Sequence, residues 1–397
     1  MKNILIISPH FFPENFIINE ISSELSDDYS ITVLTSQPSY PEGKIFEKYN
    51  GFSFQIDNFK GIKVLRVPTW PRKQTGIKFI DLILNYTFYL FFGFIRFLLI
   101  RKKMDHIFIF GVSPLFSALI PIVSKKILFK KYKITLWVQD LWPQSIYESG
   151  YLKNNFARNF FEFCMRIIYK NCDLILSQSS ALKNYIISKY QVDNVELVHN
   201  PSFDFMTSTI LLNNQSKKIL YAGNLGNFQC IEELLSEISL CESENLNIEF
   251  LIAGDGPYKE KVQQAAKRLK NLSYLGYMNQ KDLVKKIESV DFLILGLRES
   301  EVSKLIIPSK FQAYLSSSKP VIVSAGKELA NIITKNNLGY TFSFLKERDL
   351  LNLINDKILN ISYDEYLEKS SNCRKYFEEN YTINSISEKI KFLLNRT

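Results

Sequence analysis

The sequence predicts an α/β protein made of two doubly wound parallel-sheet domains. Short apolar runs typical of buried strands alternate with helical stretches through both halves of the chain. At 397 residues, 46% of them hydrophobic, the chain is too long for one ordinary core and sufficient for two. A polar stretch without periodicity, 202–217, separates the halves. We expect an N-terminal domain over 1–205 and a C-terminal domain over 217–382, with a helix over about 383–397 that packs back on the first domain.

In the first half, a loop after the first strand leads into a helix that ends near Leu25. A second helix is expected over 156–169, and a third follows the strand 173–177 and ends at Tyr190. The stretch 37–59, rich in Tyr, Pro and Gly, is expected to be a loop, and loops of this length tend to be functional. The expected strands are 4–8, 30–35, 63–67, 107–111, 134–138, 173–177 and 195–198.

In the second half, glycine turns follow several of the expected strands, and glycine lets a backbone approach a ligand closely. The first of these turns covers 223–226. The expected strands are 218–222, 248–253, 272–275, 291–295 and 321–323, and the helices between them are 231–240, 258–269 and 282–289. Neither a GxGxxG fingerprint nor a Walker loop is present, so the turns do not indicate a nicotinamide or flavin site.

One apolar stretch, 79–100, is long enough to cross a bilayer, although Asp81, Asn85 and Arg96 interrupt it. We favour a helix of the first domain with one face toward a membrane, ahead of a purely buried helix and of a transmembrane helix. Basic residues follow this stretch: Arg101, Lys102, Lys103, Lys125, Lys126, Lys130, Lys131 and Lys133. They could hold the protein on an anionic membrane surface. The alternative is that they only keep a surface helix soluble.

The net charge of +9 predicts affinity for anions: nucleic acid, anionic lipid or phosphorylated metabolites. No nucleic-acid recognition motif supports the first of these partners. The five cysteines form no CxxC pair, which indicates free thiols in a reducing cytosol and argues against a zinc site. The N-terminus lacks the features of a signal peptide, so we expect a cytoplasmic protein.

The stretch 304–323 has the pattern of an anion site. Pro308, Ser309 and Lys310 are expected in the first turn of a helix, whose unpaired N–H groups and dipole attract anions. Lys304 and Lys310 add positive charge. A helix start between the strands of an α/β sheet is where a phosphorylated ligand usually sits. The alternative is an ordinary helix start with solvated lysines.

Together the motifs resemble glycosyltransferase family 4, whose members have the GT-B fold. The series YAGNLG, FLIAGDGPYKEKV, LSYLGYMNQKDL, SVDFLIL and IPSKFQAYLSSSKPVI is similar to the C-terminal half of that family. In the N-terminal half, ISPHFFPE, LTSQPSYPEGK, LWVQDLWPQS and HNP resemble the same family, in the subgroup that builds colanic acid, capsule and O-antigen units. Within that subgroup the chain looks most similar to N-acetyl-L-fucosamine transferases of O-antigen pathways.

The resemblance implies a retaining transfer from a UDP-N-acetylamino sugar to a sugar on polyprenyl diphosphate, in a cleft between the two domains. It implies no metal and no other cofactor, and a cytoplasmic protein held peripherally at the inner membrane through its first domain. The implied donor-binding residues are Gly223, Asn224, Leu225, Gly226, Tyr277, Met278, Arg298, Pro308, Ser309 and Lys310.

Three residues are the catalytic candidates. Lys304 and Lys310 would offset charge on the leaving diphosphate, and Asp140, just beyond a strand end, would activate the acceptor or hold the donor sugar. The alternative for Asp140 is a helix cap. Glu14 and His10 lie in the first loop, where the family contacts substrates, although a lone histidine is more often structural.

The chain also departs from the family pattern. Many members carry two glutamates where this chain has Leu305 and Ala313, and Gln312 is a possible partial substitute. Many also have Arg and Lys where this chain has Asn224 and Gln229. Three alternatives stay open: a GT-B-like pair of domains that binds a nucleotide sugar without turnover, a GT-B UDP-sugar epimerase and a nucleic-acid-binding protein.

Overall fold

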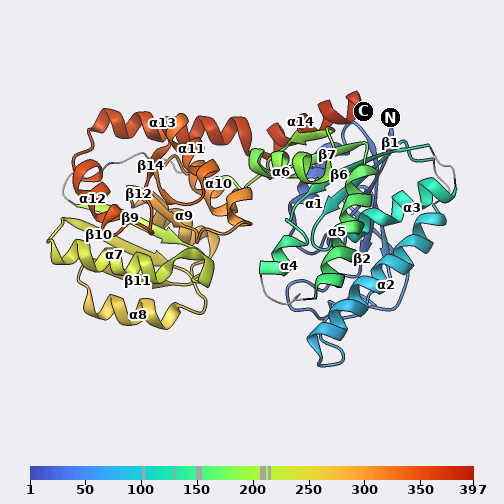
Figure 1. The fold of residues 1–397 in the computed structure, drawn as a ribbon, viewed down its shortest axis with the longest axis horizontal. Helices are drawn as coiled ribbons and strands as arrows, with labels where there is room; N and C mark the ends of the chain where they lie inside the picture. The colour runs from blue at the N-terminus through green and yellow to red at the C-terminus, as the bar shows by residue number, and fades with distance from the viewer. Residues whose placement is uncertain (101–102, 129–130, 149–153, 206–211, 213–215) are drawn as a thin grey trace. The chain divides into compact units, whose positions relative to one another are not determined.

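The computed structural model describes the chain except residues 101–102, 129–130, 149–153, 206–211 and 213–215. It divides into two compact units, Met1–His199 with Ile386–Thr397, and Asn200–Ser385. Each unit has one sheet covered by helices (Figure 1), so the predicted fold class is confirmed. Most of the stretch 202–217 lies outside the described residues, as do Arg101, Lys102 and Lys130.

Among the described residues of the first unit, the sheet has eight strands in the order β3-β4-β2-β1-β5-β6-β7-β8. The strands are β1 (Asn3–Ile7), β2 (Ser30–Ser36), β3 (Gln55–Phe59), β4 (Ile62–Val67), β5 (His106–Gly111), β6 (Lys133–Val138), β7 (Leu174–Ser177) and β8 (Val195–Leu197). Every neighbouring pair is parallel except β3–β4.

The edge strand β3 corrects the prediction of a loop over 37–59. It pairs with β4 through a two-residue turn, in which Lys60 and Gly61 have φ values of 49° and 85°. Two consecutive residues with positive φ are typical of tight hairpin turns. The strand is short, with alternately exposed residues, so its apolar signal is weaker than that of the buried parallel strands.

Seven helices accompany this sheet within the described residues: α1 (Ile17–Leu25), α2 (Lys78–Leu98), α3 (Leu119–Ile127), α4 (Gln144–Glu148), α5 (Asn155–Lys170), α6 (Ser180–Tyr190) and α14 (Ile383–Arg396). The sequence did not predict α3 and α4. From Ile386 onward α14 belongs to the first unit. It is held there by Lys391, 2.6 Å from Asp28, and by Asn395, whose side chain lies 3.2 Å from the Tyr29 hydroxyl.

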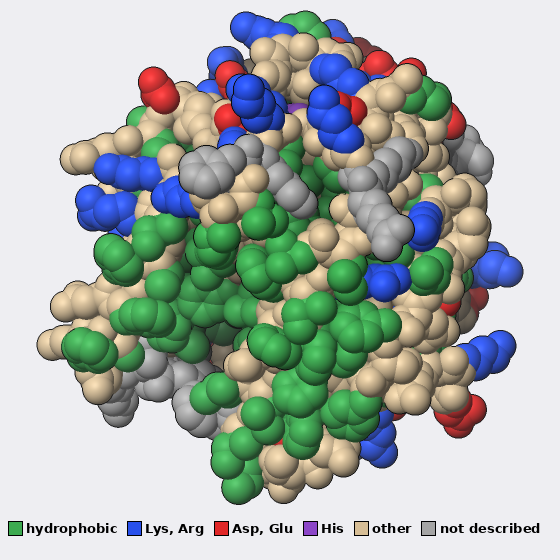
Figure 2. Space-filling view, turned by 90° about the vertical axis from the view of Figure 1, so that its right-hand side faces the viewer, with side chains coloured by type: hydrophobic (Ala, Val, Ile, Leu, Met, Phe, Trp, Pro, Cys, Tyr) green, Lys and Arg blue, Asp and Glu red, His purple; other side chains and the backbone are tan. Residues whose placement is uncertain are grey.

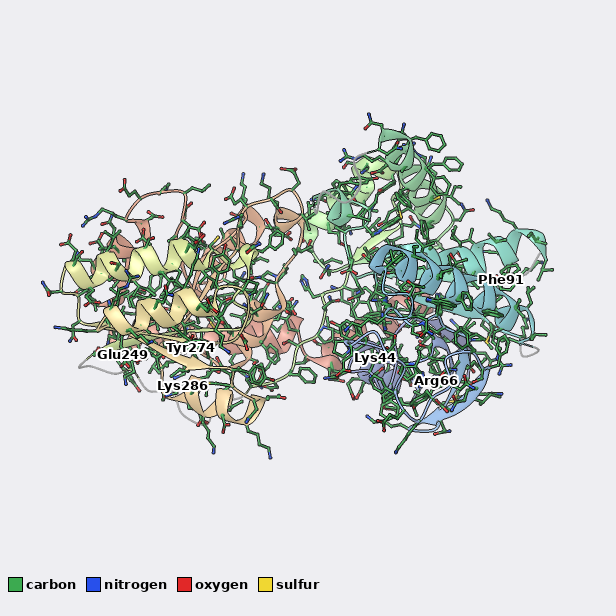
Figure 3. All side chains as sticks on the ribbon, turned by 90° about the horizontal axis from the view of Figure 1, so that it is seen from below. Lys44, Arg66, Phe91, Glu249, Tyr274 and Lys286 are labelled. Carbon is green, nitrogen blue, oxygen red and sulfur yellow. The ribbon has the colours of Figure 1, made fainter. Side chains whose placement is uncertain are left out.

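Helix α2 has one buried face and one exposed face, so it is not purely buried. Asp81 is buried and accepts hydrogen bonds from the Trp70 indole and the Thr75 amide, both at 3.0 Å. Phe91 is 60% exposed and points outward, whereas Arg66 of β4 is buried and pairs with Asp57 (Figure 3). Within the described part of the chain, α2 is the one helix long and apolar enough to span a membrane, and 28% of that apolar segment is buried.

In the described part of the second unit the sheet has six strands, all in parallel pairs, in the order β11-β10-β9-β12-β13-β14. They are β9 (Lys217–Ala222), β10 (Ile248–Ala253), β11 (Leu272–Gly276), β12 (Phe292–Gly296), β13 (Val321–Ser324) and β14 (Gly339–Thr341). The helices are α7 (Ile231–Ser243), α8 (Lys259–Arg268), α9 (Gln280–Glu288), α10 (Ser309–Ser316), α11 (Lys327–Lys335), α12 (Asp349–Leu353) and α13 (Tyr363–Asn380).

The second sheet is buried on both faces. Ile219 and Tyr221 of β9 join one apolar cluster, and Leu220 and Ala222 of the same strand join the other. Burial on both faces explains why the parallel strands read as continuous apolar runs in the sequence.

Both sheets reverse their strand order beside a central strand. In the first sheet β1 lies between β2 and β5, and in the second β9 lies between β10 and β12. The loops that follow the two flanking strands leave in opposite directions at such a switch point, and ligands of open α/β sheets bind there, beyond the carboxyl ends of the strands. The two switch points are therefore the places to look for a site in each unit.

Candidate active site

The glycine turn 223–226 follows β9 at the switch point of the second sheet. The backbone of Gly223 has φ +144°, and that of Gly254, which follows β10, has φ +147°. A Cβ atom on Gly254 would lie 1.8 Å from the Gly223 carbonyl oxygen. The buried Leu225 anchors the turn, since its amide donates to the Asp255 carbonyl at 2.9 Å. Glycine is required where these two backbones touch.

Lys310, near the start of α10, reaches this glycine turn. Its ammonium group donates to the Tyr221 hydroxyl at 2.6 Å and to the Asn224 carbonyl at 3.4 Å, and it lies over the Tyr221 ring. Desolvation lowers the pKa of Lys310 to about 8. Within the described residues no carboxylate pairs with it. The turn therefore has beside it a half-buried cation whose charge is not neutralised.

The start of α10 differs in one detail from the prediction. Pro308 has an extended backbone and is the N-cap, so the first turn begins at Ser309. No side chain caps this end, which leaves its amide groups available to an anion. Gln312 is 2% exposed, and its side chain has no hydrogen bond to any described residue. It lies in α10, one turn after Ser309 and next to Ala313 in the sequence.

Arg298 and Lys304, the other predicted cations, already have acidic partners. The guanidinium of Arg298 lies 3.4 Å from Glu233, and its amide donates to the Phe228 carbonyl at 2.8 Å. The ammonium of Lys304 lies 3.0 Å from Glu301, and this hydrogen bond raises its pKa. Both ion pairs are exposed to solvent, where the attraction between the two side chains is weak.

Tyr277 and Met278 follow β11 at the edge of the second sheet. Two strand spacings separate β11 from β9, or about 10 Å. Tyr277 is 78% exposed, whereas Met278 packs against an apolar cluster. Phe228, next to the glycine turn, is 59% exposed. The sequence did not single out Phe228, because a lone aromatic residue in a turn carries no pattern.

Asp140 follows β6 in the first unit. Its carboxylate accepts a hydrogen bond from the amide of Ser113 at 2.8 Å, so it bridges to the loop after the neighbouring strand β5. Its side chain is exposed. The carboxylate therefore lies at the carboxyl edge of the first sheet, as predicted from its place after a strand.

His10 and Glu14 form a buried pair after β1. The Nδ1 atom of His10 lies 2.8 Å from one carboxylate oxygen of Glu14. The other oxygen accepts the amides of Ser39 and Tyr40, both at 2.7 Å. The spacing of four residues is visible in the sequence, but nothing in the sequence alone shows that the two side chains meet.

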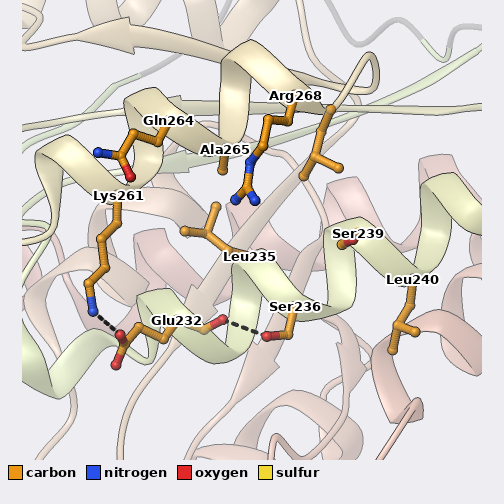
Figure 4. A pocket seen from close by; sticks show the side chains of 10 residues that line it. Glu232, Leu235, Ser236, Ser239, Leu240, Lys261, Gln264, Ala265 and Arg268 are labelled. Carbon is orange, nitrogen blue, oxygen red and sulfur yellow. Dashed lines mark hydrogen bonds and ion pairs between the residues drawn. The ribbon is translucent and has the colours of Figure 1, made fainter.

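A pocket of about 680 Å³ lies elsewhere, between α7 and α8 (Figure 4). It contains an ion pair between Lys261 and Glu232 and none of the predicted site residues. The structure places no group of three or more metal-binding side chains together in the part of the chain that it describes. All five cysteines are free.

The site residues therefore form separate groups in the two units. In the second unit the structure brings Lys310 to Gly223 and Asn224, and it places Arg298 beside Phe228. Tyr277 follows the edge strand β11, two strand positions from β9.

Comparison with known proteins gives these groups a context. Residues 219–389 match the model of the "Glucosyltransferase 3-like, C-terminal domain" family. WbjE of Pseudomonas aeruginosa, described as a probable glycosyltransferase, is 24% identical over 275 residues, which are 61% of this chain and 68% of WbjE. WcaI of Escherichia coli (strain K12), provisionally named a colanic acid biosynthesis glycosyl transferase, is 20% identical over 81% of this chain and 83% of WcaI.

Solved structures of similar fold include HepE of Anabaena in complex with UDP, with a TM-score of 0.67 at 12% identity, covering 100% of both chains. WaaG, a glycosyltransferase involved in lipopolysaccharide biosynthesis, has a TM-score of 0.61 at 14% identity, covering 98% of both chains. The relatives and the structural neighbours agree with the fold of the two units. The chain is therefore an enzyme with the GT-B fold, and it is similar to the glycosyltransferases WbjE and WcaI.

Proposed function

We propose that the enzyme transfers a sugar from a UDP-sugar to a lipid-linked saccharide during the synthesis of a surface polysaccharide or lipopolysaccharide. The observation that carries this proposal is the unpaired Lys310 ammonium beside the glycine turn. A structural neighbour was solved with UDP, and the names of WcaI and WaaG point to colanic acid and lipopolysaccharide. The finer proposal is a retaining transfer of an N-acetylamino sugar, such as N-acetyl-L-fucosamine, to a sugar on polyprenyl diphosphate.

The donor diphosphate binds between the glycine turn and α10 in this proposal. The amides of the first turn, at Ser309 and Lys310, and the backbone of Gly223 and Asn224 approach its oxygens. Fixed positive groups stabilise the negative charge that develops as the sugar–phosphate bond breaks. Lys310 supplies that charge, and Arg298 and Lys304 contribute after exchanging their exposed acidic partners for the diphosphate. No metal is needed for this task.

The nucleoside is held differently from the family pattern. We place the base against the loop with Tyr277 and Met278, with backbone contacts. The side chains of Leu305 and Ala313 cannot accept hydrogen bonds from hydroxyl groups, so the ribose uses other partners. The buried Gln312 amide, without a hydrogen bond to a described residue, is our candidate.

Asp140 is the candidate for activating the acceptor or holding the donor sugar. Its carboxylate is fixed by the Ser113 amide, and the second carboxylate oxygen remains for a sugar hydroxyl. Charge-assisted hydrogen bonds of this kind are stronger than neutral ones.

A lipid-linked acceptor requires the enzyme to work at a membrane, and the first unit has a suitable surface. Figure 2 shows a broad hydrophobic area on one face of this unit, with Lys and Arg side chains around it. We define the apolar face by the exposed side chains of α2 and α3, which pack on each other, and of α5, which packs on the 3₁₀ turn Leu115–Ala118 before α3. These side chains are Ile80, Ile83, Phe91, Leu98, Val123, Ile127, Phe156, Phe160 and Phe163.

The apolar face is proposed to dock onto an anionic bilayer on its cytoplasmic side. Phe156, Phe160 and Phe163 repeat along one side of α5 and are 81%, 54% and 60% exposed. Exposed lysines and arginines accompany them on α3 and α5, among them Lys126 and Arg166. A helix that is apolar on one side and carries basic residues nearby lies in the bilayer interface. The buried polar residues on the inner side of α2 favour this arrangement over a spanning helix.

The test is a transfer assay with a panel of UDP-sugars and a polyprenyl-diphosphate-linked N-acetylhexosamine, in which the products are identified by mass spectrometry. The proposal predicts that the acceptor mass increases by one sugar and that UDP is released in equal amount. The anomeric configuration of the product, read by NMR, decides between retention and inversion.

The second candidate is a protein that binds a nucleotide sugar without turnover. The absence of carboxylates at Leu305 and Ala313 favours it. Stabilisation by UDP with no consumption of any donor over the whole panel would support this candidate and contradict the transferase.

A further inference from the structure

The amino group of Lys310 is held by two hydrogen-bond acceptors and by no anion. Its Nζ atom donates to the Tyr221 hydroxyl at 2.6 Å and to the Asn224 carbonyl at 3.4 Å. The Tyr221 hydroxyl donates its own proton to the Asn224 carbonyl at 2.6 Å, so its oxygen is free to accept from Lys310. Burial raises the pKa of Tyr221, so this phenol stays neutral. Within the described residues no carboxylate offsets the charge of the ammonium.

These contacts determine where the lone pair of the neutral amine lies. An ammonium group has three N–H bonds, and the two acceptors use two of them. The third N–H has no partner among the described residues, so its loss breaks no hydrogen bond to them. The lone pair takes this third position and points away from Tyr221 and Asn224. Because Lys310 is only half-buried, a small reagent can approach the amine from that side.

A larger fraction of Lys310 is neutral near pH 7 than of an ordinary lysine. Desolvation lowers the pKa of Lys310 to about 8. At pH 7.5 about a quarter of such a group is neutral, against about 0.1% of a lysine with the usual pKa. Only a neutral amine attacks a carbonyl carbon, and a desolvated lysine is one form of an activated nucleophile. Lys310 therefore combines an available lone pair with a fixed position.

The surroundings of Lys310 also attract an anionic reagent. The start of α10 has no side-chain cap, so the amides of Ser309 and Lys310 are available to a phosphate. The glycine turn 223–226 carries no acidic side chain that would repel it. In an acyl phosphate, one oxygen atom joins the reactive carbonyl carbon to the phosphorus. A phosphate held at the start of α10 therefore brings this carbon close to Nζ.

We propose that Lys310 is an acylation site, at which the amine attacks an acyl phosphate held by the start of α10 and the glycine turn. A new N–C bond forms as the C–O bond to the phosphate breaks. The proton of the amine passes to the leaving phosphate. Acetyl phosphate and the neutral Lys310 thus give N-acetyl-lysine and hydrogen phosphate. The inference rests on the proposed function, because the phosphate takes the place of the donor diphosphate.

Acylation at this position would switch off sugar transfer. The product is an amide, which carries no charge and cannot stabilise a diphosphate. Its added acyl group also lies beside Gly223, where a Cβ atom would already come within 2.4 Å of Nζ. The enzyme would lose its donor site in proportion to the acyl phosphate that it meets, and UDP would protect it.

Lys261 of α8 is the matched reference lysine. It is exposed and pairs with Glu232 in the pocket between α7 and α8, away from the glycine turn. The hydrogen bond to Glu232 raises the pKa of Lys261. A reagent that selects by exposure therefore prefers Lys261. A reagent that selects by the neutral amine and by a phosphate site prefers Lys310.

Two reagents separate a phosphate site from simple reactivity. The full-length protein is treated with acetyl phosphate or with acetic anhydride, which has no phosphate, and acetylated lysines are quantified by peptide mass spectrometry. We expect acetyl phosphate to modify Lys310 at least about tenfold faster than Lys261, because of its larger neutral fraction. The preference should be smaller with the anhydride. Inorganic phosphate and UDP should each slow the reaction at Lys310 and leave Lys261 unchanged.

A second measurement connects the modification with the donor site. In the treated wild type, thermal stabilisation by UDP should decline as the acetylated fraction of Lys310 grows. Lys310→Arg keeps a positive charge and cannot form the amide. Whatever its starting response to UDP, that response should resist acetyl phosphate. An equal decline in Lys310→Arg would place the effect at another residue and contradict the inference.

Two further results would overturn the acylation site. One is acetylation of Lys310 no faster than that of Lys261. The other is the same preference for Lys310 with both reagents, which would show that no phosphate is bound. If UDP stabilises the protein but Lys310 does not react, only this inference fails. If Lys310 reacts and inorganic phosphate slows it, but UDP neither binds nor protects, the inference stands and the proposed UDP-sugar site fails.

Discussion

The ammonium group of Lys310 fills the space that a side chain on Gly223 would occupy. A Cβ atom at Gly223 would lie 2.2 Å from Cε and 2.4 Å from Nζ of Lys310. The charge at the glycine turn thus comes from α10, since the turn and the residues after it carry the neutral side chains of Asn224 and Gln229. Substitution of either Gly223 or Lys310 should therefore impair the binding of UDP.

Replacing Lys310 tests its role on the donor. Lys310→Met keeps the apolar stem of the side chain and removes the ammonium. We expect turnover to fall at least about 100-fold, as it does when one preorganised charge-stabilising group is removed. The melting temperature at neutral pH should not fall, because no ion pair is lost and the desolvation cost of the ammonium group is removed. The matched variant Lys304→Met removes an exposed lysine that is paired with Glu301 and should cost less. Turnover near wild type in Lys310→Met contradicts the assignment.

The pH dependence of UDP binding follows from the same residue. Desolvation lowers the pKa of Lys310 to about 8 in the free protein, and a bound diphosphate would raise it again. Above pH 8 the free protein has lost this proton and the complex keeps it, so binding takes up a proton. We expect the Kd for UDP to rise toward tenfold per pH unit between about pH 8 and 9.5. Calorimetry should find this slope in the wild type and not in Lys310→Met.

The stability of the ligand-free protein should rise with pH over a similar range, whereas UDP binding weakens. The folded pKa of Lys310 lies below its ordinary value of 10.5, so the unfolded chain binds more protons between about pH 8 and 10.5. The contribution of Lys310 to the free energy of unfolding therefore rises with pH in that window. Comparison of denaturant unfolding of the wild type with that of Lys310→Met isolates it. An identical pH dependence in both proteins would count against a desolvated Lys310.

The substitution Gly223→Ala should abolish UDP binding while the protein still folds. Gly223→Ala forces Lys310 away and strains a residue with φ +144°, so UDP should no longer raise the melting temperature. Gly61→Ala is the control, because Gly61 has φ +85° with open space around it and carries only the backbone strain, about 1 kcal/mol. Full stabilisation by UDP in Gly223→Ala would show that the turn does not hold the diphosphate.

Asp140 should be needed for turnover but not for nucleotide binding. In Asp140→Asn an oxygen can still accept the Ser113 amide, so the loop is preserved while the charge is lost. We expect a loss of turnover of about 100-fold or more and unchanged stabilisation by UDP. The two readouts come from different units, so a parallel loss of UDP binding would point to misfolding. Normal turnover would remove Asp140 from the catalytic residues.

The apolar face should determine membrane binding. Replacement of Phe156, Phe160 and Phe163 by Ser removes three exposed rings from one side of α5. Binding to vesicles with anionic lipid should weaken by at least about tenfold, because each buried ring contributes about 1.5–3 kcal/mol. Phe228→Ser, at an exposed ring of the second unit, is the control. Equal flotation of the triple variant and the wild type contradicts the proposed docking face.

The fold was largely predictable because its parallel strands are buried on both faces. β10 was predicted with the boundaries that it has, since its residues 250–253 are a continuous apolar run that ends at a glycine. The strand β3 was missed because it is an exposed edge strand, and α3 was missed because its residues Leu119–Ile127 follow a short 3₁₀ turn without a start signal.

Site residues could be predicted only where residues adjacent in the sequence form a recognisable pattern. Lys310 next to Pro308 and Ser309 has the pattern of a helix start, and the structure places it near the glycine turn. The contact with Tyr221 joins residues 89 positions apart, which no local pattern reveals. The same limit applies to His10, whose pairing with Glu14 and stacking on Phe16 depend on the path of the loop after β1.

The most direct test of the account is thermal stabilisation by UDP, GDP, ADP and dTDP, measured on the wild type and on Lys310→Met. A ligand present at 100 times its Kd stabilises the folded state by about 2.7 kcal/mol. We expect a rise in melting temperature with UDP alone, and a smaller rise in Lys310→Met. A rise with another nucleotide would keep the site and change the donor. No rise with any nucleotide, or an undiminished rise in the variant, would contradict the central claim that Lys310 and the glycine turn hold a UDP-sugar.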